Sequence, residues 1–134
     1  MPPQFLADTH IVLHWRNNPR KLSKEQLRIL RAEVHHERPV AVSAFSLIEL
    51  AILMSERRVL TKDTPEQFFA ELESNAAFQI LPITFQIAAE FASVGHHLRD
   101  PADRAIVATA RVHRLRLITS DQRIMDSKLV PVIA

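Results

Sequence analysis

The stretch DPADRAIVATA, residues 100–110, is the part of this chain that says most about its fold, because it predicts how a long helix begins. Asp100 fits the N-cap position, Pro101 the first helical position and Asp103 the third. Arg104 lies in the same first turn, where the helix dipole disfavours a cation by about 0.3–1 kcal/mol. We therefore expect an anion near Arg104, either an acid cluster or a substrate phosphate. Capping alone explains both acids, but we favour Asp100 as the cap and Asp103 as a ligand.

Short apolar runs alternate with helical patterns along the rest of the chain. The predicted strands cover residues 4–7, 40–42, 78–81, 115–119 and 130–133. The predicted helices cover residues 9–16, 23–38, 43–57, 65–74, 84–94, 101–113 and 122–125, and the one over 43–57 is largely buried. Capping boxes open two of them, at Ser23–Gln26 and Thr64–Gln67. This alternation predicts an α/β fold of three layers, with about five short, mostly parallel strands between helices.

Composition bounds the class of protein. At 134 residues with 47% hydrophobic side chains, the chain is long enough for one domain with a real core. It has no cysteine, which excludes disulfides and thiolate metal sites, and a single glycine, which disfavours phosphate-cradling nucleotide folds. No apolar run is long enough to span a membrane, and the N-terminus lacks a signal-type segment. We therefore expect a cytoplasmic protein.

Three more carboxylates stand where burial or a strand end is expected. Asp8 directly follows one predicted strand, and Asp121 comes two residues after another. Glu49 lies among apolar residues on the helix over 43–57. The carboxyl ends of parallel strands share one edge of a sheet, where ligands bind. Either aspartate could instead be an N-cap, and Glu49 could pair with an arginine. A shared site is the simplest single explanation, and carboxylate oxygens favour Mg²⁺ or Mn²⁺ over zinc.

Other titratable residues carry weaker signals. His10 and His14 are spaced four residues apart but lack the HExxH context of a zinc site, so we expect most histidines at the surface or the rim. If four acids hold metal, 17 basic residues face 11 of the 15 acidic ones. Such an excess of positive charge would suit a polyanionic substrate.

These segments resemble a known family. FLADTH at 5–10, VSAFSLIEL at 42–50, DPADRAIVATA at 100–110 and LITSD at 117–121 are similar to the motifs of a PIN domain, and more narrowly to VapC-type toxins of bacterial type II toxin–antitoxin modules. The likeness covers nearly the whole chain in order and spacing. It implies a single PIN domain over residues 1–134 with a compact α/β/α fold, acting as an endoribonuclease.

The resemblance also implies roles for individual residues. It makes Asp8, Glu49, Asp103 and Asp121 a catalytic quartet that binds Mg²⁺ or Mn²⁺. A hydroxyl near the last acid matches Thr119 or Ser120, which we expect to contact the substrate. We add Arg104 and Arg99 as candidates for contact with RNA phosphates. Relatives often have histidine or glycine where this chain has Arg99.

A VapB-like antitoxin that silences the enzyme, and a homodimer, are the implied partners. Leu53, Met54 and Phe68 are candidate exposed apolar residues for such contacts. Two alternatives stay open. One is a PIN-like module that holds RNA or protein without cutting it. The other is an acid-cluster phosphotransfer domain, although two of the key acids here lie on predicted helices.

Overall fold

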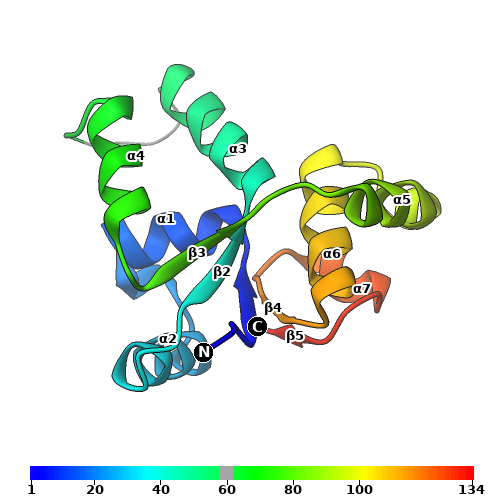
Figure 1. Cartoon of the computed structure of the whole chain (residues 1–134), viewed down its shortest axis with the longest axis horizontal. Helices are drawn as coiled ribbons and strands as arrows, with labels where there is room; N and C mark the ends of the chain where they lie inside the picture. Colours follow the sequence, from blue (N-terminus) through cyan, green and yellow to red (C-terminus); the bar gives the residue numbers. More distant parts are fainter. Residues whose placement is uncertain (58–61) are drawn as a thin grey trace.

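A five-stranded sheet forms the centre of the computed structural model, which describes residues 1–57 and 62–134 (Figure 1). The strand order is β3-β2-β1-β4-β5, and all four neighbouring pairs are parallel. The strands are β1 Phe5–Ala7, β2 Val40–Ser43, β3 Phe78–Leu81, β4 Arg116–Ile118 and β5 Val132–Ile133. The predicted parallel sheet of five short strands is confirmed.

Helices follow the strands as the alternating pattern predicted. They are α1 Thr9–Asn17, α2 Lys24–His35, α3 Ala44–Ser55, α4 Pro65–Ser74, α5 Phe85–Ser93, α6 Pro101–His113 and α7 Gln122–Ser127, with 3-10 turns η1 Pro19–Lys21 and η2 Val94–His96. Both predicted capping boxes are present, at Ser23 with Gln26 and at Thr64 with Gln67. In the part of the chain described above, no helix is long and apolar enough to cross a bilayer.

The two faces of the sheet bury two separate apolar cores, because side chains alternate along each strand. Phe5 and Ala7 point into the core formed with α1, α2 and α4, and Leu6 points into the core formed with α6 and α7. Figure 1 shows α1, α2 and α4 on one side of the sheet and α5, α6 and α7 on the other. This arrangement confirms the predicted three-layer fold.

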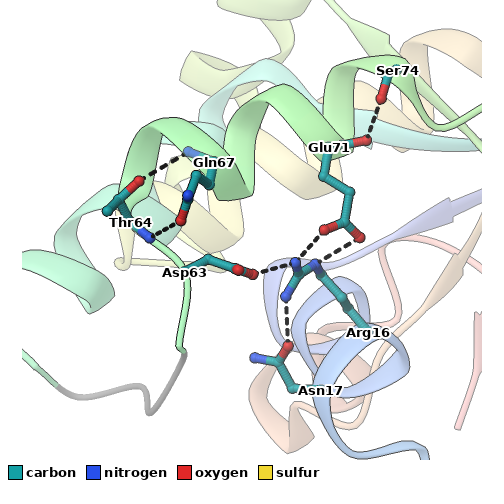
Figure 2. A network of polar contacts seen from close by, with 7 residues as sticks. All are labelled: Arg16, Asn17, Asp63, Thr64, Gln67, Glu71 and Ser74. Carbon is teal, nitrogen blue, oxygen red and sulfur yellow. Dashed lines mark hydrogen bonds and ion pairs between the residues drawn. The ribbon is translucent and has the colours of Figure 1, made fainter.

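Arg16, at the end of α1, fixes α4 to the first layer (Figure 2). Its Nη2 lies 2.5 Å from Oδ2 of Asp63 and also pairs with the carboxylate of Glu71 on α4. The guanidinium carbon stands 4.6 Å from the centre of the Phe68 ring. The hydrogen bond with Glu71 is the largest cause that raises the pKa of Arg16.

The apolar residues predicted to be exposed are not the ones at the surface. Leu53 and Phe68 are buried and Met54 packs against the core, so the prediction was wrong for them. On α3 the buried positions are Ser46, Leu50 and Leu53, which lie on one side of a helix at i, i+4 and i+7. The exposed apolar side chains in the described ranges include Ile48, Ile52, Ile83 and Phe85.

Candidate functional site

A cavity of about 330 Å³ lies at the carboxyl ends of the central strands. Its lining includes all four acids of the predicted quartet, Asp8, Glu49, Asp103 and Asp121, together with Asp100. Asp8 follows β1, Asp121 follows β4 by three residues, Glu49 lies on α3 and Asp103 on the first turn of α6. Segments far apart in the sequence therefore contribute their carboxylates to one concave surface.

Asp8 both caps α1 and lines the cavity. Its Oδ1 accepts a hydrogen bond of 2.9 Å from the Ile11 N–H, and its Oδ2 accepts one from the Thr119 hydroxyl. Burial raises the pKa of the Asp8 carboxyl, because desolvation outweighs the lowering effect of these two hydrogen bonds. Asp8 therefore serves both as the cap of α1 and as part of the rim at the carboxyl ends of the strands.

Thr119 lies behind the acids instead of facing the cavity. It is fully buried, and its hydroxyl donates to Asp8 while it accepts a hydrogen bond of 3.1 Å from the Asp121 N–H. This placement does not support the predicted contact with substrate, but it makes Thr119 a positioning residue for two acids. Ser120 does line the cavity, and its Oγ accepts a 3.0 Å hydrogen bond from Nε2 of Gln26.

Glu49 reaches the cavity because α3 is tied to α1 one turn earlier. The Thr9 hydroxyl donates a 2.9 Å hydrogen bond to the Ser46 hydroxyl, and both residues are buried. Glu49 follows Ser46 by three residues and so lies on the same side of the helix. It is partly exposed, so the prediction of a largely buried helix was wrong at this position. Ile48 and Ile52 beside it are exposed as well.

Asp103 lies in the first turn of α6, next to two other acids of the cavity. As predicted, Asp100 is the cap of α6, and its Oδ1 accepts from the N–H groups of Ala102 and Asp103 at 2.9 and 3.1 Å. Burial, and then the negative charges of Asp121 and Asp100, raise the pKa of Asp103 to about 7. Its Oδ2 is buried and has no hydrogen-bond partner among residues 1–57 and 62–134.

Several cationic or titratable residues line the cavity although they were not predicted to belong to the site. Arg123 lies with its Nη2 3.3 Å from Oδ2 of Asp103 and 3.3 Å from Oδ2 of Asp121. Lys21, His10 and His14 also contribute to the lining. Partial burial, and then the charge of Lys21, lower the pKa of His14. Two signals in the sequence could have indicated these residues. Arg123 comes two residues after Asp121, and His10 comes two residues after Asp8.

Arg104 does not line this cavity, contrary to its predicted contact with substrate phosphate. Its Nη2 donates a 2.9 Å hydrogen bond to the Phe91 carbonyl, and its guanidinium carbon stands 4.1 Å from the centre of the Phe91 ring. Phe91 lies in the last turn of α5, where carbonyls lack helical partners and favour a cation. A Cβ at Gly95 would lie 2.5 Å from this Nη2, so the glycine makes room for the arginine.

Arg99 is the remaining predicted contact residue. It is exposed and is not part of the cavity lining either. Its position in the segment between η2 and α6 offers no support for a direct role at the acids.

The acids offer carboxylate oxygens, the ligand type that a hard divalent cation prefers. Among the residues that the structure describes, no three histidine or acidic side chains lie close enough together to hold a metal ion as they stand. Mg²⁺ does not need such a cluster, since it usually keeps several waters and binds through one or two carboxylates. Oδ2 of Asp103 is buried and accepts no hydrogen bond from the described part of the chain, and burial and neighbouring negative charges raise the pKa of this carboxyl. A divalent ion bound here would favour the charged form of Asp103.

Comparison with known proteins points to one family. A family profile described as PIN domain matches residues 5–127. The chain is 31% identical to Ribonuclease VapC22 of Mycobacterium tuberculosis, over 92% of this chain and 91% of that protein.

Solved structures share the fold. VapBC2 from Rickettsia felis, bound to a DNA fragment from their promoter, superposes with a TM-score of 0.72 at 15% identity, over 99% of this chain and 98% of that one. A toxin–antitoxin complex from Klebsiella pneumoniae superposes with a TM-score of 0.67 at 23% identity, over 96% and 95% of the two chains.

Proposed function

This chain belongs to the PIN domain family and to its VapC-type ribonucleases, and from that premise we propose that it cuts RNA at the acidic cavity as the toxin of a toxin–antitoxin module. The observation that carries the proposal is the shared cavity. Asp8, Glu49, Asp103 and Asp121 all line it although they come from four separate segments. The resemblance to Ribonuclease VapC22 supports RNA as the substrate.

We infer that Mg²⁺ or Mn²⁺ is the cofactor and that these four acids are its ligands, directly or through water. A bound divalent ion would lower the pKa of a water nucleophile and stabilise charge on the phosphate. The chain's own part is to hold the carboxylates in place. Asp8 is held at both oxygens, by the Ile11 N–H and the Thr119 hydroxyl, so its orientation is set before any ligand binds.

Binding of the RNA backbone needs cationic or hydrogen-bonding groups next to the acids. Lys21 and His10 line the same cavity and are the residues we propose for contact with phosphate oxygens, with Ser120 as a further hydrogen-bonding group. The Ser120 hydroxyl already accepts from Gln26, which leaves its O–H free to donate. Single-stranded segments suit such an open site, because their bases can be splayed out.

A partner protein is the other part of the proposal. The Klebsiella pneumoniae structure is a toxin–antitoxin complex, which supports a cognate antitoxin of the VapB kind for this chain. The exposed apolar side chains Ile48, Ile52 and Phe85 are the surface we propose for contact with an antitoxin or a second copy. Ile48 and Ile52 lie one turn apart on α3, and exposed apolar neighbours of this kind are typical of such contacts.

Cleavage of RNA by the purified protein tests the proposal. We expect cleavage with Mn²⁺, none with EDTA, and a loss of at least about 100-fold in Asp8→Asn, comparable with removal of one group that stabilises transition-state charge. Asparagine keeps the cap of α1, so the fold should survive. Asp126→Asn is the matched control, because Asp126 is exposed and is not part of the cavity lining.

The same experiment decides between cleavage and binding alone. RNA that is bound but left intact by the wild-type protein with Mn²⁺ would favour the non-catalytic PIN-like module. Membership of the PIN domain family removes the support for a phosphotransfer domain.

A further inference from the structure

Arg123 occupies the mouth of the acidic cavity with its charged end between two acids. Its Nη2 lies 3.3 Å from Oδ2 of Asp103 and 3.3 Å from Oδ2 of Asp121, and its Nε lies 3.5 Å from Oδ1 of Asp121. We propose that Arg123 is a built-in counter-ion, which neutralises Asp103 and Asp121 in the metal-free protein and must be displaced when a divalent cation binds. This inference rests on the proposed function, because it assumes a divalent ion at the cavity.

The position of Arg123 explains why the acids are tolerated without metal. Carboxylates that lie close together repel one another, and one guanidinium shared between two of them offsets part of that repulsion. The acids are the more enclosed partners, since the side chains of Asp103 and Asp121 are 12% and 25% exposed. Arg123 is 69% exposed and therefore approaches them from the solvent side.

The contacts of Arg123 are of the kind that a metal ion can replace. Its distances to the carboxylate oxygens are at the long end for charge-assisted hydrogen bonds, which are usually about 2.7–2.9 Å. The contact with Asp103 lacks hydrogen-bond geometry altogether, because Oδ2 of Asp103 has no hydrogen-bond partner in the described chain. An exposed arginine can rotate into solvent without moving the backbone, so displacement need not disturb α7.

A divalent ion and this guanidinium exclude each other. Both would use Oδ2 of Asp103 or Asp121, and a doubly charged ion at those oxygens would repel the arginine. Metal binding therefore has to break two ion pairs in the wild-type protein. Removing the arginine charge should make metal binding tighter, whereas a residue that orients the acids for metal would make it weaker when removed.

Mn²⁺ titration by calorimetry tests the inference on the full chain. We expect Arg123→Gln to bind Mn²⁺ about three- to fivefold more tightly than the wild type, since exposed ion pairs contribute modestly. Arg116→Gln is the matched control, with the same loss of charge at the opposite end of β4 and an expected affinity within error of the wild type. Equal or weaker Mn²⁺ binding by Arg123→Gln would overturn the inference.

Thermal unfolding gives a second readout that does not depend on activity. In EDTA the Arg123→Gln variant should unfold at a lower temperature than the wild type, because the acids lose their counter-ion. In saturating Mn²⁺ that difference should close, and a difference that persists would overturn the inference. Wild-type protein that binds no Mn²⁺ would refute the proposed function and this inference together. Wild-type binding with an unchanged variant would refute the inference alone.

Discussion

The Thr119 hydroxyl donates a hydrogen bond to Oδ2 of Asp8, and this contact joins the carboxyl end of β4 to that of β1. The two strands are already parallel neighbours, with Ala7 opposite Ile118. The same hydroxyl accepts from the Asp121 N–H, so one buried side chain orients two acids of the cavity. A group with no access to the cavity thereby sets the geometry of the proposed site.

Replacing Thr119 with valine should weaken both the fold and the proposed metal site. The change keeps the shape but leaves Oδ2 of Asp8 and the Asp121 N–H without their partner, which costs about 1–3 kcal/mol of unfolding free energy. We expect weaker Mn²⁺ binding as well, measured by calorimetry on protein shown to be folded. Thr109→Val is the control, since the Thr109 hydroxyl donates to the Ala105 carbonyl within the same helix, α6. Mn²⁺ affinity unchanged in Thr119→Val would contradict a positioning role.

The raised pKa of Asp103, about 7, predicts how stability depends on pH. The ordinary value for an aspartate is near 3.9, so between about pH 4 and pH 7 the folded protein binds more protons than the unfolded chain. The contribution of Asp103 to stability is therefore present in full below about pH 4 and is lost as pH rises through about 7. We expect the melting temperature of the wild type in EDTA to fall from pH 5 to pH 8. The same melting temperatures at both pH values, in the wild type and in Asp103→Asn alike, would contradict this prediction.

Metal binding should have the opposite dependence on pH. Bound carboxylates must be deprotonated, so Mn²⁺ affinity should rise roughly tenfold per pH unit below pH 7 for each proton released. Calorimetry in buffers of different ionisation enthalpy measures this proton release directly. Affinity that does not change between pH 5.5 and 7 would mean that Asp103 is not a ligand.

The Asp103→Asn variant should be more stable than the wild type in the absence of metal. Loss of the negative charge relieves repulsion from Asp121 and Asp100, and we expect a gain on the order of 1 kcal/mol at pH 8 in EDTA. The same variant should lose Mn²⁺ binding and RNA cleavage. A less stable Asp103→Asn protein would show that the carboxylate stabilises the metal-free fold, contrary to this account.

Arg16 should matter for stability and not for the acidic cavity. We expect Arg16→Gln to lower the unfolding free energy by about 1–2 kcal/mol, because it removes ion pairs with Asp63 and Glu71 and the contact over the Phe68 ring. Arg28→Gln, which breaks one fully exposed pair with Glu25, should have a much smaller effect on stability. Chemical denaturation measures both, and a change in Mn²⁺ affinity in Arg16→Gln would contradict this separation.

The elements of the fold were predictable because their signals are local. The capping boxes at Ser23 and Thr64, and the cap and proline at Asp100, mark helix starts that the structure confirms. The parallel sheet followed from the alternation of strands and helices. Asp8 and Asp121 could be placed at one edge for the same reason, since each lies just beyond the end of a predicted strand.

The predictions that failed concerned side chains whose contacts lie between segments far apart in the sequence. Arg104 was expected to face an anion, but it lies against the last turn of α5, which no spacing in the sequence reveals. Thr119 looked like a substrate contact because it precedes Asp121, yet its hydroxyl points to Asp8 on the neighbouring strand. Glu49 looked buried because its neighbours are apolar, although α3 leaves Ile48 and Ile52 at the surface.

Crystals of the protein soaked with Mn²⁺ give the most direct test of the central claim, that these four acids hold a divalent cation. We expect an anomalous peak within the cavity, bounded by the carboxylates of Asp8 and Asp103, with the Arg123 side chain turned away. No peak at the acids, or peaks only beside histidines elsewhere on the surface, would contradict it.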